Sequence, residues 1–229
     1  MSNYILKIRS FMLAFLFIQL VGCSNDKRDE PNNQKTVTEN ENAAVAKKKS
    51  IVFFGNSLTA GYGLSPNEAF PALIQKKLDS LHLSYQVINA GVSGETSSGG
   101  RTRIDWILQQ PVDIFVLELG ANDGLRGIPL SATKRNLQEI IDKVKAKNAQ
   151  TKLLFAGMQL PPSMGQAYTT EFRNLYTDLA EKNSMALIPF LLEGVGGEAE
   201  LNQADGIHPT AEGHRIVAEN VWKELQKLL

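Results

Sequence analysis

The amino-acid sequence predicts an α/β protein whose parallel sheet is covered by helices. After residue 49, five short apolar runs alternate with longer segments of helical periodicity, which is typical of βαβ units. Each run is apolar along most of its length, as expected of a strand with helices on both faces. The chain has 229 residues, enough for one globular domain with a sizeable core. We therefore expect a single domain at residues 50–229 with five parallel strands.

The expected strands and helices alternate along this domain. The strands are expected at residues 51–54, 85–89, 113–119, 152–157 and 186–189. The helices are expected at residues 66–81, 98–109, 131–147, 166–183 and 209–228. Ser65 with Pro66, and likewise Ser131, indicate helix starts, because serine caps a helix and proline fits its first turn. Pro209 is expected to begin the last helix.

The N-terminal segment has the layout of a secretory signal. Lys7 and Arg9 precede an apolar run of about eleven residues, which is too short for a membrane span of roughly 20 residues. The run ends at Leu20-Val21-Gly22-Cys23, which resembles the lipobox of bacterial lipoproteins. That resemblance implies a signal peptide at residues 1–22, lipidation of Cys23 and anchoring to a membrane of the bacterial cell envelope, facing the periplasm or the cell exterior.

Composition excludes several classes of function. Residues 23–49 are polar and lack aromatic side chains, so we expect a flexible linker. Without residues 1–22 the chain keeps 22 basic and 24 acidic residues, a net charge of −2, which argues against nucleic-acid binding. The chain has one cysteine and three histidines, and they do not show the spacing of metal ligands. The sequence also lacks a phosphate-binding loop, so we expect neither a metal nor a cofactor.

Two stretches far apart in the sequence supply complementary chemistry. Ser57 follows the first expected strand in Gly55-Asn56-Ser57-Leu58-Thr59, and His208 precedes the last helix in Asp205-Gly206-Ile207-His208-Pro209. A serine hydroxyl is a weak nucleophile unless an imidazole takes its proton and a carboxylate holds that imidazole in the right tautomer. We therefore expect His208 to act as the base for Ser57 and Asp205 to orient His208.

Two further loops carry donors that suit a developing oxyanion. Gly94 lies in the loop after the second expected strand, where it can present its backbone N–H without a side chain in the way. Asn122 follows the third expected strand, and its side-chain amide is a neutral donor. Because parallel strands end at the same edge of a sheet, we expect these loops to lie near Ser57.

In sequence order these four segments resemble the conserved blocks of the SGNH (GDSL-type) hydrolases, over residues 50–229. The subgroup of arylesterases, lysophospholipases and thioesterase I is most similar, through residues 56–62 and 118–127. The resemblance implies a three-layer α/β/α, flavodoxin-like sandwich. It also implies Ser57 as nucleophile, Asp205 with His208 as the base pair, and an oxyanion hole made by Ser57, Gly94 and Asn122.

One position departs from the family pattern. Asn56 stands where the family has the aspartate of its Gly-Asp-Ser-Leu motif. That aspartate flanks the nucleophile and is not the carboxylate of the triad. We expect altered hydrogen bonding in this loop and retained activity.

The expected reaction is hydrolysis of carboxylic esters or thioesters through an acyl-serine intermediate. Aryl esters, lysophospholipids and acyl thioesters are the substrates that the resemblance implies. Residues 125–129 and 158–165 are expected either to shape the pocket rim or to serve as ordinary loop packing. Two rival functions stay open: a carbohydrate O-acetylesterase, and a catalytically idle lipoprotein that binds ligands on the same scaffold.

Overall fold

The computed structural model describes residues 48–229. The expected signal peptide at residues 1–22, the lipidation site Cys23 and almost all of the linker lie outside the described residues. The expected linker extends to residue 49, but Lys49 is the first residue of a strand, where its N–H donates to the carbonyl of Ser84 at 3.0 Å. Of the helices in residues 48–229, none has the length and apolar character needed to span a membrane.

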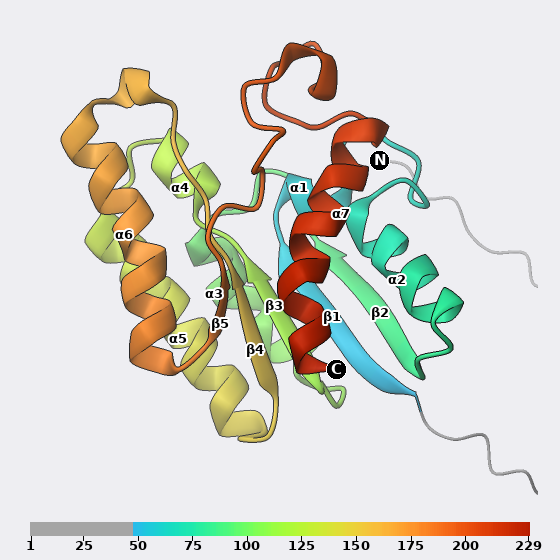
Figure 1. Cartoon of the computed structure of the whole chain (residues 1–229). Coiled ribbons are helices and arrows are strands. Elements are labelled where there is room, and N and C mark those ends of the chain that lie inside the picture. The colour runs from blue at the N-terminus through green and yellow to red at the C-terminus, as the bar shows by residue number, and fades with distance from the viewer. Residues whose placement is uncertain (1–47) are drawn as a thin grey trace, which may run out of the picture. The chain divides into compact units, whose positions relative to one another are not determined.

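Five parallel strands form one sheet in the order β2-β1-β3-β4-β5 (Figure 1). The strands are β1 (Lys49–Gly55), β2 (Tyr85–Gly91), β3 (Ile114–Glu118), β4 (Lys152–Ala156) and β5 (Ala186–Ile188). Each of them overlaps a predicted strand. The strand order is the flavodoxin-like one, so the predicted fold class is confirmed.

Helices cover both faces of the sheet (Figure 1). One face carries α2 (Phe70–Ser80) and α7 (Ala211–Leu225), and the other carries α3 (Ser97–Ile107), α5 (Leu130–Lys147) and α6 (Gln166–Asn183). The short helices α1 (Ser57–Ala60) and α4 (Ala121–Leu125) follow β1 and β3. Three short 3₁₀ segments complete the order: η1 (Pro162–Met164), η2 (Ala199–Leu201) and η3 (Gln226–Leu228).

The expected start of the first long helix is wrong. The pattern Ser65-Pro66 predicts a start at residue 66, but α2 begins at Phe70 with a proline in its first turn. The residues before it form a turn in which the N–H of Glu68 donates to the carbonyl of Ser65 at 2.9 Å. Serine followed by proline favours turns as well as helix starts, so this local signal does not separate the two.

Three other helix starts differ by one or two residues, and among them α3 begins at Ser97, one residue before the expected start. α5 begins at Leu130 after Pro129, so Ser131 lies inside the helix and does not cap it. α7 is capped by Thr210, whose hydroxyl oxygen accepts the N–H of Gly213 at 3.2 Å, so Pro209 lies outside the helix.

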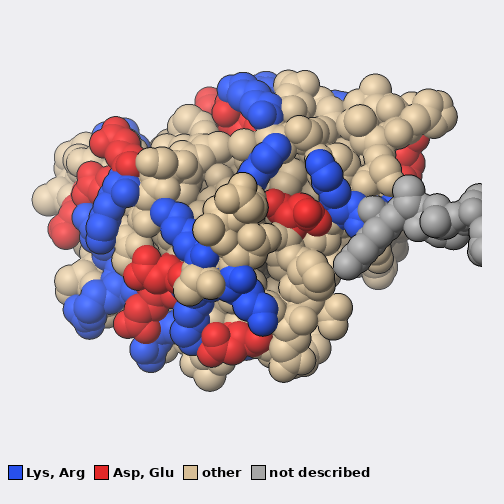
Figure 2. Space-filling view, turned by 90° about the horizontal axis from the view of Figure 1, so that it is seen from below, with Lys and Arg blue, Asp and Glu red and all other residues tan. Residues whose placement is uncertain are grey.

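Burial follows the position of each strand in the sheet. β1, β3 and β4 are buried along nearly their whole length, as predicted for strands covered on both faces. β2 is only partly buried, because it is an edge strand with a single neighbour. When the molecule of Figure 1 is seen from below, its surface intermixes Lys and Arg with Asp and Glu (Figure 2). That face therefore carries no patch of a single charge.

A buried histidine joins α7 to α2. The Nδ1 atom of His214 accepts the N–H of Phe70 at 3.1 Å, and the two rings stack with centroids 6.0 Å apart. The side chain of His214 is 1% exposed. Burial, with a smaller contribution from His208, lowers the pKa of His214 to about 4.

The free energy of unfolding is expected to fall between pH 7 and pH 5, because His214 takes up a proton more readily in the unfolded chain. Because the pKa of His214 is lowered in the folded state, the stability that neutral His214 contributes is complete above about pH 6.5 and is lost as the pH falls toward 4. One such group contributes a slope of up to about 1.4 kcal/mol per pH unit. Urea denaturation at the two pH values measures the loss in the wild type and in His214→Asn, whose amide oxygen can accept from Phe70 without titrating.

His82→Asn is the matched control for this experiment. His82 is exposed and has a φ of 54°, a conformation that asparagine tolerates. The control should lose as much stability as the wild type, and His214→Asn should lose less. Equal losses in all three proteins would contradict the prediction.

Candidate active site

Ser57, His208 and Asp205 form one series of hydrogen bonds beyond the carboxyl ends of the strands. The Oγ atom of Ser57 is 2.8 Å from Nε2 of His208, and Nδ1 of His208 is 2.6 Å from Oδ2 of Asp205. The N–H and the ring of His208, together with the N–H of Ile207, hold the pKa of Asp205 well below its usual range. This arrangement can pass the Ser57 proton to His208 while an ionised Asp205 stabilises the imidazolium.

Ser57 is presented by a tight turn between β1 and α1. A Cβ atom on Gly55 would lie 2.2 Å from Oγ1 of Thr59, so this turn has room only for glycine. Asn56 caps α1, because its Oδ1 accepts the N–H of Leu58 at 2.9 Å. Ser57 is the first residue of α1, where backbone N–H groups have no partner within the helix. Its N–H is therefore suited to bind an oxyanion.

The loops of Gly94 and Asn122 are joined by a hydrogen bond to Glu95, the residue after Gly94. The side-chain amide of Asn122 donates to the backbone carbonyl of Glu95 at 3.0 Å, which leaves its second hydrogen for another acceptor. Gly94 has a φ of 78°, and its carbonyl accepts from the guanidinium of Arg126 at 3.0 Å. The structure thus brings the two predicted oxyanion donors into neighbouring loops.

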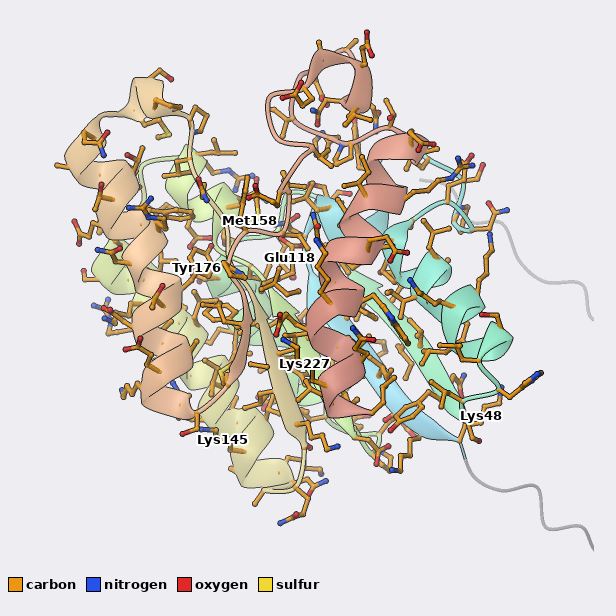
Figure 3. All side chains as sticks on the ribbon, viewed as in Figure 1. Lys48, Glu118, Lys145, Met158, Tyr176 and Lys227 are labelled. Carbon is orange, nitrogen blue, oxygen red and sulfur yellow. The ribbon has the colours of Figure 1, made fainter. Side chains whose placement is uncertain are left out.

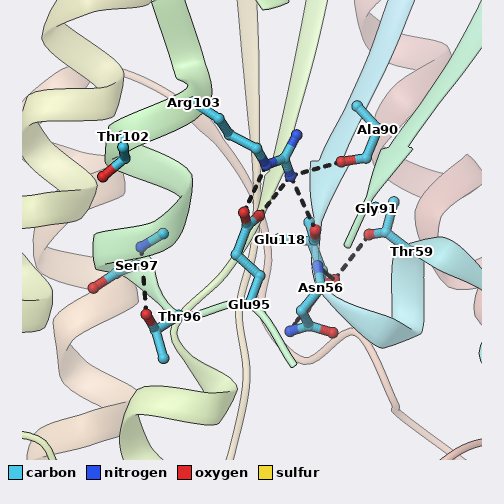
Figure 4. A network of polar contacts seen from close by, with 12 residues as sticks. Asn56, Thr59, Ala90, Gly91, Glu95, Thr96, Ser97, Thr102, Arg103 and Glu118 are labelled. Atoms are coloured by element: carbon cyan, nitrogen blue, oxygen red, sulfur yellow. Dashed lines mark hydrogen bonds and ion pairs between the residues drawn. The ribbon is translucent and has the colours of Figure 1, made fainter. Parts of the chain in front are cut away.

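An ion pair that the sequence analysis did not identify holds the Gly94 loop (Figure 4). Nε of Arg103 donates to Oε1 of Glu95 at 2.6 Å, and its Nη2 bonds the other carboxylate oxygen. Nη2 also donates to the carbonyl of Ala90 at 2.8 Å, and the guanidinium lies 3.9 Å from the ring centroid of Phe54. Arg103 therefore ties β1, β2 and the Gly94 loop together. The eight-residue spacing of the pair carries no local signal that would have revealed it.

A second buried acid, Asp123, follows Asn122 in α4. Asp123 accepts from the N–H of Ser97 at 2.8 Å and from its hydroxyl at 2.6 Å. The hydroxyl of Thr133 also donates to Asp123, at 3.3 Å. Asp123 thereby links α4 to α3 and α5, directly after Asn122 in the sequence. The sequence analysis identified its neighbour Asn122 but not Asp123.

Exposed apolar side chains occur in the segments that follow β1, β2 and β3 and in the segment before α7. Each of four site loops contributes one large hydrophobic residue that is 42 to 51% exposed: Tyr62, Val92, Leu125 and Ile207. The ring of Tyr62 lies against that of His208, with centroids 4.6 Å apart. Met158 and Leu160, from one segment considered for the rim, are instead buried in the core.

The described residues do not group ligands for a metal. Within residues 48–229, no three side chains of His, Cys, Asp or Glu lie close enough to hold an ion. The site thus consists of a hydroxyl, an imidazole, a carboxylate and neutral N–H donors.

Comparison with known proteins identifies the family. A model of the "GDSL-like Lipase/Acylhydrolase family" matches residues 53–216, more than half of the chain. Esterase TesA of Pseudomonas aeruginosa is 40% identical over 185 residues, which cover 80% of this chain and 91% of TesA. Thioesterase 1/protease 1/lysophospholipase L1 of Escherichia coli K12 is 37% identical over 186 residues, which cover 81% of this chain and 87% of that protein.

The solved structures agree with the sequence matches. The crystal structure of TesA superposes with a TM-score of 0.76 at 40% identity, covering 79% of this chain and 100% of TesA. The matched residues include the four loops that hold Ser57, Gly94, Asn122 and His208. The predicted family and fold are therefore confirmed. The chain belongs to the GDSL-like lipase/acylhydrolase family, the SGNH hydrolases, and is similar within it to TesA and thioesterase 1.

Proposed function

We propose that this esterase hydrolyses carboxylic esters and thioesters of apolar acyl groups through an acyl-serine intermediate. The observation that carries the proposal is the series Ser57, His208 and Asp205, with separations of 2.8 and 2.6 Å. The names of the relatives, an esterase and a thioesterase with lysophospholipase activity, cover the same bond classes.

Acylation begins when His208 takes the hydroxyl proton of Ser57. The Oγ atom then attacks the carbonyl carbon and the carbonyl oxygen becomes an oxyanion. In the proposed geometry the N–H groups of Ser57 and Gly94 and the amide of Asn122 bind this oxyanion. Loss of one such donor typically costs about 3–4 kcal/mol of transition-state stabilisation. As the intermediate collapses, His208 returns the proton to the leaving alcohol or thiol, and the acyl group stays on Ser57.

Deacylation uses the same groups in reverse. His208 takes a proton from water, the hydroxide attacks the acyl carbonyl, and a second oxyanion forms in the same hole. The carboxylic acid leaves as His208 protonates Oγ of Ser57, which restores the starting state. Asp205 stabilises the imidazolium in both halves of the cycle without accepting the proton.

The proposed role of Ser57 predicts selective reaction with a fluorophosphonate probe. The wild type should be labelled at Ser57, because phosphorus takes the place of the acyl carbon, and Ser57→Ala should not be labelled. Gel fluorescence and mass spectrometry of the labelled peptide measure this. Ser131→Ala is the matched control, since Ser131 is exposed on α5, and it should label like the wild type. A folded wild-type protein without label would exclude the hydrolase and favour the idle binding protein.

The substrate class follows from the apolar rim. The exposed side chains of Tyr62, Val92, Leu125 and Ile207 would lose contact with water when an acyl chain lies among them. Burial of apolar surface is worth roughly 25 cal/mol per Å², so longer chains should bind better than acetate. An acetyl group has much less apolar surface to bury against these side chains.

Activity on p-nitrophenyl esters should rise from acetate to medium chains. Leu125→Ser should lower kcat/KM for the octanoate ester about three- to tenfold and change the acetate value little, because only the longer chain reaches the rim. Leu81→Ser is the matched control, as Leu81 is 52% exposed at the end of α2 and should leave both values unchanged. Activity confined to acetate would favour the O-acetylesterase.

We also propose that lipidation of Cys23 anchors the enzyme to a membrane of the bacterial cell envelope, facing the periplasm or the cell exterior. Support comes from the sequence: a charged start, an apolar run and Leu20-Val21-Gly22-Cys23. Lipid chains contribute about 0.8 kcal/mol per buried CH₂, so several chains on Cys23 would bind the enzyme firmly. An anchored enzyme would act on esters at or near the membrane surface.

Expression in a bacterium with radioactive palmitate tests the anchor. The wild type should carry label and sediment with the membranes. Cys23→Ala should lose the label, because Cys23 is the only thiol in the chain. Ser24→Ala serves as the neighbouring control and should behave as the wild type. A wild-type protein without label would contradict lipidation.

A further inference from the structure

Glu118 is a buried acid that the proposed reaction does not use. It is the last residue of β3 and pairs in register with Gly55 of β1, next to the turn that presents Ser57. Its side chain is 1% exposed and lies in the interior at the end of β3 (Figure 3). Among residues 48–229, no Lys, Arg or His forms an ion pair with it. The groups that form hydrogen bonds with this carboxyl are therefore neutral.

Three donors from the Ser57 turn bond the Glu118 carboxyl group (Figure 4). Oε2 accepts the backbone N–H of Asn56 at 3.0 Å and the hydroxyl of Thr59 at 2.8 Å. Oε1 accepts the side-chain Nδ2 of Asn56 at 2.7 Å. Burial raises the pKa of Glu118 to about 7, although these donors favour the carboxylate. Both oxygens of Glu118 face hydrogen-bond donors of the turn. The ionised form of Glu118 therefore fits these donors better than the protonated form.

The contacts connect Glu118 to the nucleophile through one residue. Glu118 bonds both the backbone and the side chain of Asn56, which fixes the orientation of the Asn56 amide. The other end of that amide, Oδ1, accepts the N–H of Leu58 at 2.9 Å. Ser57 lies between these two anchored residues. Its Oγ and its N–H are therefore placed by bonds that begin at Glu118.

We infer that Glu118 is a positioning residue for Ser57, acting through Asn56, and that the two side chains are matched as one amide donor and one carboxylate acceptor. This inference rests on the proposed role of Ser57 as nucleophile. An aspartate at position 56 would bring two carboxyls within hydrogen-bond distance, and such a pair holds together only by sharing a proton.

Two other titratable side chains belong to the same region. Tyr176 of α6 donates its hydroxyl to the carbonyl of Leu119 at 3.1 Å. Burial, with the charges of Glu118 and Asp123, raises the pKa of Tyr176 well above its usual value, so it stays neutral. The described hydrogen bonds of Tyr176 and Asp123 do not involve Asn56. Substitution at Asn56 and Glu118 thus changes one local set of bonds.

The inference is tested by exchanging the amide of Asn56 and the carboxyl of Glu118 between the two positions. Glu118→Gln places an NH₂ group against donors of the turn, and we expect kcat for a p-nitrophenyl ester to fall about tenfold with KM changed less than about threefold. Addition of Asn56→Asp reverses the bond, because the introduced amide can donate to the introduced carboxylate. The remaining oxygen still accepts from the backbone and from Thr59. The double variant should recover kcat to within about threefold of the wild type.

The single variant Asn56→Asp adds a readout that depends on pH. Near pH 6 its two carboxyls share a proton and kcat should stay within about threefold of the wild type. Toward pH 9 that proton leaves, and kcat relative to the wild type should fall about tenfold. The double variant has one carboxyl and should show no such fall. A loss of general stability alone would not produce this difference between the variants.

Glu139→Gln, on the exposed face of α5, is the matched control and should keep wild-type kcat. Wild-type kcat in Glu118→Gln, or a double variant no better than Glu118→Gln, would overturn the inference. If circular dichroism shows that Glu118→Gln does not fold, the double variant decides: folded and active, it supports the match, and unfolded, it refutes it. Failure of the proposed function shows separately, as wild-type protein that the fluorophosphonate does not label at Ser57.

Discussion

The pairing of β1 with β3 is the constraint on which the rest of the structure depends. Its register sets Gly55 opposite Glu118, so these two adjacent strands end together. The strand order reverses at this pair, since β2 lies on one side of β1 and β3 on the other. Loops that follow the two strands open at the crevice where α/β sheets bind ligands. Ser57 comes from one of these loops and Asn122 from the other.

Burial separates the polar groups of the site into two sets. Asp205, His208 and the rim lie near the surface, where substrate arrives. Glu95, Glu118 and Asp123 are buried, and each accepts two or more hydrogen bonds. Displacement of a loop would leave one of these acids with an unpaired oxygen, which costs about 1–3 kcal/mol. The buried set therefore holds the loops of Gly94 and Asn122, the proposed oxyanion donors, in place before substrate binds, as electrostatic stabilisation of a transition state would require.

The strands and the meeting of the four loops can be predicted from the sequence, because apolar runs and the common edge of parallel strands need no detailed geometry. The roles of the buried acids cannot be predicted in this way. Glu118 ends an apolar run and Glu95 lies in a polar loop, and only cross-strand register and helix packing bring donors to them. Helix starts fail for a related reason. Ser65 and Pro66 have the same local chemistry in a turn as in a cap, and tertiary packing selects between the two.

The loop before α7 carries both Asp205 and His208. An isolated bridge pairs Asn202 with Pro209, and the backbone N–H of Gln203 donates to the carbonyl of His208 at 2.7 Å. The side chain of Gln203 bonds the carbonyl of Tyr62 at 2.7 Å, which ties the loop to the chain beyond α1. Since Asp205 and His208 are three residues apart in one closed loop, their mutual geometry is a local property of the chain. Within the series Ser57, His208 and Asp205, tertiary packing therefore has to maintain only one separation, the 2.8 Å between His208 and Ser57.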